Sequence, residues 1–538
     1  MTTQTILRLF SRSVAIVMLV VIAGMHGCDI SDPTEGIVAK LNTKERATTI
    51  SVVFQDAATG EPVTDTEVHA RIFGQDQGAV IDLLNQSKRE FFVRDGFLSF
   101  AVRDELRPDT DTPVRFTITA TADGYISTSQ PVSVVAPGNP VEINMVNTTP
   151  GRLPAGVTGE VNLPIGSMSG GQTTEDINFQ SSPDPANDVT AIARFAIQEG
   201  TQIRDEQGNP LNGDLVSTFH LFNSENDESL HSFPGGFSAN IENIDEVNET
   251  ESVDDGFFFI TGGFLSMNIE DQNGRQAAEF NPPMQVSMEL SDDQLTEEDG
   301  REAREGDTAP IWSYNEEDGA WRFEQNAPIS QGENRLEVQF ESPHLSWWNI
   351  DWIGPRCWPG LTVNLIDYRG SIRAILRRQA NDAWLSGGVT SGDQLQFLYP
   401  PANMAGKLEF YDMHDRHIHS VENIQDLCQT IDITLPPYET DEINVTFRGR
   451  GICEDPDDIE LRPNFPVWYR PADVFRWTYA GTVQNGEINM TFPSAQEYVF
   501  GGFFDGRFYQ YTLDLSDVED GHVFDEIIEL PQSICDDL

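Results

Sequence analysis

The sequence predicts an all-β protein made of antiparallel Greek-key β-sandwiches in tandem, with only a few short helices. Two observations predict this fold class: apolar and polar residues alternate with a period of two, and turn-forming dipeptides separate the alternating runs. Abundant Gly (43 residues) and Pro (31 residues) supply further turns. Helical periodicity is scarce and indicates two short helices, at 79–90 and 420–430.

The alternating runs occur along the whole chain. Within one of them, Ile443, Val445 and Phe447 alternate with Asn444 and Thr446, which is typical of a half-buried strand. Asp-Gly and Asn-Gly pairs between the runs favour hairpin turns. The clearest runs are residues 50–55, 116–121, 361–365, 443–447 and 511–515.

Residues 1–27 predict a signal peptide. Arg8 and Arg12 give a positive start, and an uncharged apolar run over 14–25 leads to Met25-His26-Gly27-Cys28. This run is shorter than the roughly 20 residues that a membrane span needs. Its end resembles the lipobox of bacterial lipoproteins, which implies that Cys28 becomes a lipidated N-terminus. An ordinary secretory signal followed by a coincidental cysteine is the alternative.

The lipid on Cys28 would be the membrane contact of the mature protein, with residues 28–45 as a polar tether. We therefore expect a lipid-anchored protein of the bacterial outer membrane or cell surface. The other four cysteines all lie in the last third of the chain, and an even number outside the cytoplasm predicts disulfides. We expect the pairs Cys357–Cys428 and Cys453–Cys535; the rival pairing joins Cys428 to Cys453 and Cys357 to Cys535.

The length of 538 residues suits three to five domains. In the first, 46–147, a strand and turn over 52–63, the turn Asp95-Gly96 before a strand, and the turn Asp123-Gly124-Tyr125 after one occur in a recognisable order. This order resembles the carboxypeptidase-regulatory-like, or transthyretin-like, family. The resemblance implies a small sandwich that acts as an accessory or spacer module and has no catalytic role.

The remaining chain divides into a linker, 148–190, a central β domain, 191–352, and two further sandwiches, 353–438 and 439–538. The central domain carries two aromatic blocks, residues 310–321 and 343–351. Together they resemble a domain of cartilage intermediate layer proteins and bacterial surface lipoproteins. That resemblance implies an extracellular structural or binding role and transfers no active-site residues.

Two groups of residues are candidates for a site. Asp415, His417 and His419 would share one face of a strand and could hold a metal ion, but a polar hairpin turn explains them better, so we predict no metal. Four tryptophans close together could stack on a sugar, or could belong to the core at a domain junction, which we favour. They are Trp347, Trp348, Trp352 and Trp358.

The charge excludes some functions and favours one habitat. With 33 basic and 87 acidic residues, the net charge is −54, so binding to nucleic acid is not expected. Only four of the basic residues are lysines, and Arg without Lys over an acidic excess is typical of proteins that stay soluble in high salt. A GC-rich genome is the alternative explanation, but it would explain only the scarcity of lysine and not the excess of acidic residues.

These observations favour a lipid-anchored, non-catalytic modular protein with a structural or adhesion-type binding role, monomeric and without a cofactor. Its ligand would be a protein or a glycan. The sequence contains none of the familiar hydrolase or phosphate-binding motifs. Two alternatives remain open: a glycan-binding accessory lipoprotein of an uptake system, and a hydrolase with an unrecognised site.

We expect folding stability to rise with salt beyond the physiological range, because ions screen the repulsion among exposed carboxylates. Thermal unfolding in NaCl between about 0.1 M and 2 M measures this. An unchanged melting temperature would contradict the prediction and leave GC bias as the reason for the missing lysines.

Overall fold

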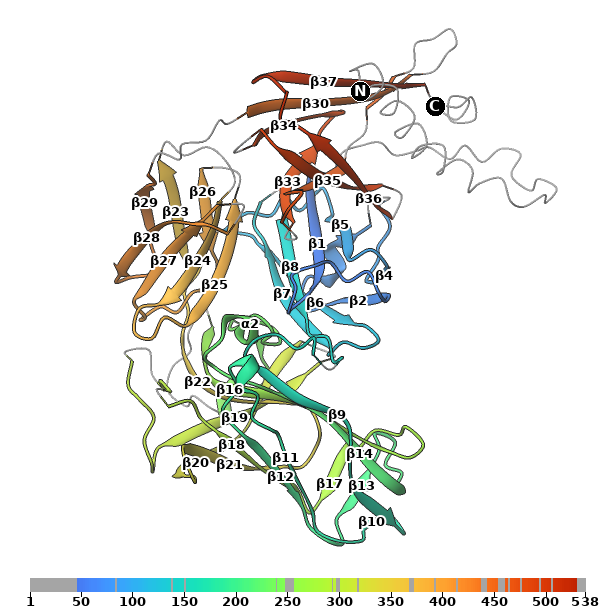
Figure 1. Cartoon of the computed structure of the whole chain (residues 1–538), viewed down its shortest axis with the longest axis vertical. Helices are drawn as coiled ribbons and strands as arrows, with labels where there is room; N and C mark the ends of the chain where they lie inside the picture. Colours follow the sequence, from blue (N-terminus) through green and yellow to red (C-terminus); the bar gives the residue numbers. More distant parts are fainter. Residues whose placement is uncertain are drawn as a thin grey trace, which may run out of the picture.

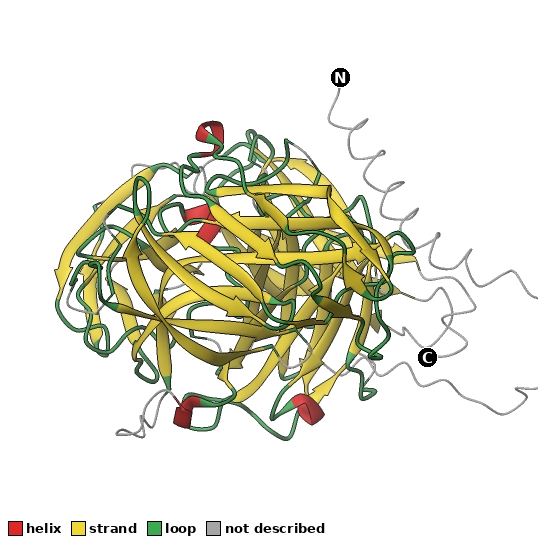
Figure 2. Ribbon diagram, turned by 90° about the horizontal axis from the view of Figure 1, so that it is seen from below, coloured by secondary structure: helices red, strands yellow, loops and turns green. Residues whose placement is uncertain are grey.

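The computed structural model describes residues 46–529, apart from 83–84, 137–138, 150, 239, 247–255, 293, 297–299, 317–318, 367–371, 391–392, 413–414, 437–442, 453–459, 463–464, 475–476, 493–494 and 505–506. Strands dominate it, as Figure 2 shows, and the all-β prediction is confirmed. Among the described residues, the regular helical segments are α2 (Asp227–Leu230) and the short turns Gln77–Ala79, Pro185–Asn187 and Ile244–Glu246. Within the same part of the chain, no helix is long and apolar enough to cross a membrane.

The two helices expected from the sequence are wrong. In the first segment Val80 and Ile81 pair with a neighbouring strand, and a turn at Asp82 follows, with Asn85 in the left-handed region at a φ of 69°. In the second, residues 417–424 and 430–434 are strands. In runs this short, apolar residues three or four apart match a helical pattern by chance, and pairing with neighbouring strands determines the secondary structure instead.

The first sandwich has two four-stranded sheets, ordered β3-β5-β1-β8 and β4-β2-β6-β7, around one apolar core (Figure 1). Its strands are β1 (Thr48–Asp56), β2 (Val68–Phe73), β3 (Val80–Ile81), β4 (Glu90–Val93), β5 (Phe97–Val102), β6 (Val114–Thr121), β7 (Thr128–Val134) and β8 (Asn139–Met145).

The third sandwich has sheets ordered β26-β23-β29 and β25-β24-β27-β28. Its strands are β23 (Leu361–Ile366), β24 (Ile372–Arg378), β25 (Trp384–Thr390), β26 (Gln394–Phe397), β27 (Gly406–Tyr411), β28 (His417–Ile424) and β29 (Thr430–Thr434). The fourth has β30 (Ile443–Ile452), β31 (Glu460–Leu461), β32 (Phe465–Pro471), β33 (Thr478–Val483), β34 (Glu487–Phe492), β35 (Glu497–Phe504), β36 (Arg507–Asp514) and β37 (His522–Glu529).

All three sandwiches follow one topology. The opening strand of each (β1, β23 or β30) lies between a middle strand, with which it is antiparallel, and the last strand, with which it is parallel. The second sheet keeps the same order each time: β4-β2-β6-β7, β25-β24-β27-β28 and β33-β32-β35-β36. The parallel pair refines the antiparallel arrangement expected from the sequence, and the shared order indicates a repeated module.

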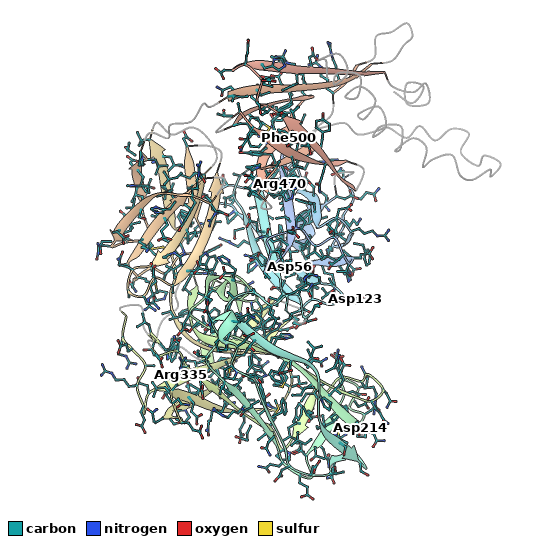
Figure 3. The ribbon with its side chains drawn as sticks, viewed as in Figure 1. Asp56, Asp123, Asp214, Arg335, Arg470 and Phe500 are labelled. Atoms are coloured by element: carbon teal, nitrogen blue, oxygen red, sulfur yellow. A yellow bond between two sulfur atoms is a disulfide. The ribbon has the colours of Figure 1, made fainter. Side chains whose placement is uncertain are left out.

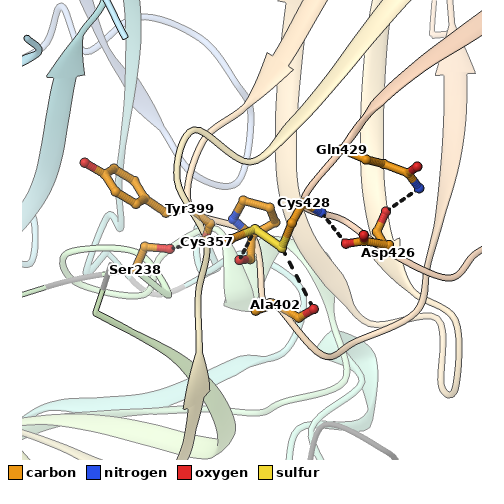
Figure 4. Close-up of a disulfide and its surroundings, with 8 residues drawn as sticks. Ser238, Cys357, Tyr399, Ala402, Asp426, Cys428 and Gln429 are labelled. Atoms are coloured by element: carbon orange, nitrogen blue, oxygen red, sulfur yellow. Dashed lines mark hydrogen bonds between the residues drawn. A yellow bond between two sulfur atoms is a disulfide. The ribbon is translucent and has the colours of Figure 1, made fainter. Parts of the chain in front are cut away.

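The parallel pair also explains a disulfide. Because β23 and β29 run side by side in the same direction, with Thr362 opposite Thr430, the residues before each strand meet at one end. Cys357 and Cys428 occupy these places and form a disulfide with a Cα–Cα distance of 5.9 Å (Figure 4). This is the first of the two expected bridges. Cys453 and Cys535 lie outside the described residues, so their pairing stays a prediction.

The central unit is larger than the sequence indicates. Residues 148–190, expected as a linker, contribute a 13-residue strand, β9, and two short strands to one continuous 14-stranded sheet. The strands are β9 (Val157–Ser169), β10 (Gln172–Thr173), β11 (Ile177–Gln180), β12 (Ala193–Ile197), β13 (Gln202–Arg204), β14 (Gly213–Phe222), β15 (Asn240–Ile241), β16 (Phe257–Asp271), β17 (Glu279–Asn281), β18 (Met284–Glu289), β19 (Thr308–Asn315), β20 (Ala320–Gln331), β21 (Leu336–Ser342) and β22 (Trp347–Pro355).

Strand β22 separates two apolar cores. Trp348 and Ile350 face the core inside the folded sheet of the central unit. Trp347 faces a second core, which also contains Phe233 and continues into the third sandwich as far as Leu408. Because alternate residues of a strand point to opposite faces, one strand serves both cores, and the central unit and the third sandwich pack as one body.

A buried histidine lies on β14. His220 is 1% exposed and stands opposite Gly159 of β9, where any larger residue would collide with the imidazole ring. The ring Nε2 has no hydrogen-bond partner among the described residues. Burial lowers the pKa of His220 from 6.5 to about 4, so the imidazole is neutral in the folded protein at neutral pH.

We expect His220 to make the central unit sensitive to acid. The unfolded chain takes up a proton below pH 6.5 and the folded chain only near pH 4, so stability is full above 6.5 and falls between these values. At about 1.4 kcal/mol for each tenfold difference in proton affinity, the loss amounts to about 3 kcal/mol. In unfolding measurements from pH 7 to 4, His220→Gln should lack this loss and the exposed His417→Gln should keep it. Equal pH profiles in the two variants would contradict the prediction.

Candidate functional site

The four units surround one cavity of about 1420 Å³, and residues of every unit line it. In Figure 1 the third sandwich lies beside the first, the central unit lies below both, and the fourth sandwich lies above the first. Ligand sites for small molecules usually have volumes of about 300–1000 Å³. The cavity is therefore large enough for a ligand with several linked units.

Tyr399 lies where three of the units meet. Its hydroxyl accepts hydrogen bonds from Arg115 Nε (2.7 Å) and Ser133 Oγ (3.2 Å) of the first sandwich. Its carbonyl oxygen accepts one from Ser238 Oγ (2.9 Å) of the central unit, a contact drawn in Figure 4. A residue of the third sandwich thus holds two other units, one of them through a partner 284 positions away in the sequence.

A stack of rings and guanidinium groups reinforces this junction. The Tyr399 ring packs on the Trp358 ring at a centroid distance of 4.7 Å, and Arg356 Cζ lies 4.3 Å from the Tyr399 centroid. Arg115 Cζ lies 4.9 Å from the Trp358 ring, whose Nε1 donates to the carbonyl of Thr110 at 2.9 Å. Cation–π contacts of this kind are worth about 0.5–2 kcal/mol each.

The disulfide Cys357–Cys428 also stabilises this junction. Cys357 precedes Trp358, and its backbone N–H donates to the carbonyl of Pro400, the residue after Tyr399, at 3.1 Å. The bridge to Cys428, drawn in Figure 4, therefore fixes the segment that carries Trp358, and the hydrogen bond to Pro400 links this segment to the one that carries Tyr399. We infer that the position of the stack depends on the covalent link as well as on the sheet.

The fourth sandwich closes on the first through aromatic packing. Phe97 of β5 contacts Trp468 and Trp477 edge to face, at centroid distances of 5.7 and 5.6 Å. These rings are almost fully buried together with Val53. Arg470, which Figure 3 places at this boundary, lies over Trp477 at 5.2 Å. The last unit of the chain thus packs against the first.

An ion pair joins the central unit to the third sandwich. Arg377 of β24 donates to both carboxylate oxygens of Asp227 in α2, at 2.6 and 2.9 Å, and its Nε donates to Glu409 at 2.7 Å. Burial disfavours the Glu409 carboxylate, but hydrogen bonds from Arg377, Lys407 and Tyr411 outweigh it and lower the pKa of Glu409 to about 2. These charges are paired, so we assign them a structural role.

The tryptophans of the chain fall into two groups, one in the central unit and one at the cavity. The chain has nine tryptophans, of which five lie on β19, β20 and β22 of the central unit. The other four all line the cavity: Trp358, Trp384, Trp468 and Trp477. Trp384 begins β25 and is half-buried, and its ring meets the His231 ring edge to face at a centroid distance of 4.4 Å.

The charge of the cavity differs from that of the chain. Its described lining has three arginines and three acidic residues, whereas the chain has 33 basic and 87 acidic residues. The arginines are Arg115, Arg356 and Arg373, and the acids are Glu142, Glu228 and Asp415. Eight amide side chains also line it: Gln55, Gln75, Gln130, Asn139, Asn144, Asn240, Gln394 and Gln396. The cavity is polar without the net negative charge of the rest of the protein.

The structure separates the four tryptophans that the sequence grouped. Trp347 and Trp348 are 2% and 1% exposed in two different cores, and the half-buried Trp352 donates its Nε1 to the carbonyl of Thr308. Only Trp358 reaches the cavity lining. The sugar-stacking interpretation of this cluster is therefore wrong for Trp347 and Trp348, and the core interpretation holds for them.

Asp415, His417 and His419 do not form a metal site in the structure. Asp415 lies in the turn between β27 and β28 and pairs with Arg373 at 2.8 Å, while His417 Nε2 contacts Ser420 Oγ at 2.7 Å. Over the described ranges, no three such side chains gather in a way that could hold a metal ion. Cys28 lies outside the described residues.

Sequence reasoning missed Trp384, Tyr399 and Arg115. Tyr399 lies in a turn before Pro400, and its partners belong to another unit, so no local pattern reveals it. The spacing of tryptophans is the one signal in the sequence that could have drawn attention to Trp384.

Comparisons with known proteins add little. No family model matches the sequence, and no curated protein matches it. A streptococcal ancillary pilin is 8% identical and aligns over 42% of this chain and 93% of its own, with a TM-score of 0.12. The major pilin subunit BcpA of Bacillus cereus is 8% identical over 90% of this chain and 99% of its own, with a TM-score of 0.13. Scores this low support no argument about function.

We expect Tyr399→Phe to cost about 1–2 kcal/mol of folding stability, because Arg115 and Ser133 lose their shared acceptor. Its effect should overlap with that of Arg115→Gln, so that the double variant loses less than the sum of the two. The matched combination with Arg89→Gln, an exposed arginine elsewhere in the first sandwich, should be additive. Unfolding in urea measures all five variants, and additivity in both pairs would contradict a link through Tyr399.

Proposed function

We propose that this chain is a lipid-anchored, non-catalytic binding protein of the bacterial cell envelope, in which four units close around one ligand cavity. The observation that carries this proposal is that every unit lines the cavity. A spacer built of tandem modules needs contacts only between sequence neighbours. Here the first sandwich also contacts the third, through Tyr399, and the fourth, through Phe97.

The contacts between units suit a preformed site. Apolar packing and a charged pair join the central unit to the third sandwich, and apolar packing joins the first sandwich to the fourth. The contact of Arg115 with Trp358 joins the first sandwich to the third, so relative motion of the units would break several kinds of interaction together. A site that is already formed loses less conformational freedom on binding, and this favours affinity. The repeated module is one that we propose to be transthyretin-like, which agrees with an accessory rather than a catalytic role.

The anchor in this proposal rests on residues 1–28. The positive start, the short apolar run and Gly27-Cys28 support lipidation of Cys28. The following 28–45 tether would hold the folded units away from the bilayer, and the net charge of −54 would keep them from docking on anionic lipid. The cavity would then be open to ligands outside the cell membrane.

We expect Cys28→Ala to release the protein from membranes, because the lipid has no other attachment point in this proposal. Fractionation of cells followed by detection of the protein in the membrane and soluble fractions measures this. Ser31→Ala, a substitution in the same tether, is the matched control and should stay in the membrane fraction. A Cys28→Ala protein that remains with the membrane would refute the anchor.

A further inference from the structure

Strand β25 presents an aromatic ring beside a glycine. Trp384 is half-buried, and among the described residues its indole N–H has no hydrogen-bond acceptor. Gly387 follows on the same strand, and a Cβ there would lie 3.9 Å from Trp384 Nε1, whereas a Cβ on Gly388 would point at Leu395 and Phe397 of the core. Because Gly387 adds no side chain, a flat ligand can approach the strand next to the indole ring.

The polar groups of the cavity match hydroxyl groups. Amide side chains offer donors and acceptors together, as the hydroxyls of a sugar require. Gln396 of β26 lines the same wall as Trp384. Gln130, Asn139 and Asn144 line the wall of the first sandwich; each amide donates one hydrogen bond within the protein and keeps a second N–H donor. A sugar ring has apolar C–H faces that pack on an aromatic ring, and hydroxyls at its edge that bond to amides.

The charge of the lining favours a neutral ligand. Arg115 bonds to Tyr399, Arg356 lies over the same ring, and Arg373 pairs with Asp415. The arginines are therefore engaged within the protein, and three acids balance them. An anion would also have to approach a protein of net charge −54, and the electrostatic repulsion between them slows association.

Three strands at the cavity resist the addition of a peptide strand. β25, β7 and β8 are edge strands of their sheets, which is where an extended peptide would pair. Pro131 lies within β7, Pro140 lies within β8, and the pairing of β25 has an irregularity near Leu376. Proline and bulges on edge strands prevent strand pairing, because they remove or displace backbone donors. At these three strands a peptide is thus a poorer fit than a saccharide.

From these observations we propose that the cavity binds a neutral oligosaccharide, with Trp384 as its stacking surface. The inference rests on the proposed function of the cavity as a ligand site and adds the chemical class of the ligand. Gln396 lies on the same wall and would bond to the hydroxyls of the sugar.

The test uses the full-length protein in a detergent without a sugar head group. The probes are neutral tetra- to hexasaccharides derived from β-1,4-glucan, α-1,4-glucan, xylan and mannan, titrated by calorimetry and tryptophan fluorescence. We expect at least one to bind with a Kd between about 10 μM and 1 mM. Trp384→Ala should weaken this binding at least about tenfold, and Trp384→Phe should weaken it less.

Two further variants separate binding from folding. Trp352→Phe changes a half-buried tryptophan outside the cavity lining and should leave the affinity unchanged. Gln396→Ala removes an amide from the lining without opening the core, and it should weaken binding about threefold to tenfold. This variant tests the site if Trp384→Ala does not fold.

The outcomes distinguish this inference from the proposed function. Binding of an uncharged extended peptide, with no saccharide bound, would overturn the saccharide class and leave the binding function standing. Binding that Trp384→Ala and Gln396→Ala leave unchanged would place the saccharide elsewhere and overturn the inference. Recovery of a shortened saccharide would overturn the non-catalytic function while supporting the ligand class.

Discussion

The hydrogen bonds and ring contacts of Tyr399 are the constraint on which the arrangement of the units depends. Its backbone has a φ of 56°, a left-handed conformation that costs a residue with a side chain about 1 kcal/mol. The hydrogen bonds from Arg115, Ser133 and Ser238 offset this cost. The strained turn also places a third-sandwich side chain against the first sandwich, so this residue helps to fix those two walls of the cavity relative to each other.

The strands could be predicted from the sequence, but the way they pack into larger units could not. The alternation over 443–447 depends only on neighbouring residues, and it correctly indicates β30. The linker expected at 148–190 is the opposite case, since Gly159 and Gly166 give β9 the composition of a loop. Each glycine is there because a side chain from another strand, His220 or Ile177, occupies its space. A pattern of single residues does not contain that information.

The same limit applies to the candidate site. The disulfide Cys357–Cys428 could be predicted because the ends of one module are enough to suggest it, and the parallel pairing of β23 with β29 gives the physical reason. In the chain-entropy model, a loop of 71 residues makes such a bridge worth about 4 kcal/mol. The cavity could not be predicted, because residues such as Arg115 and Trp384 come together only when whole modules pack.

The aromatic residues at the junctions link closure to binding. Trp358 and Trp477 pack between units and also line the cavity, so the rings that hold the units together form part of its surface. A ligand that contacts the first and third sandwiches at once would bind the closed arrangement only. By mass action it would stabilise that arrangement, and the junctions around Tyr399 and Phe97 would in turn strengthen its binding.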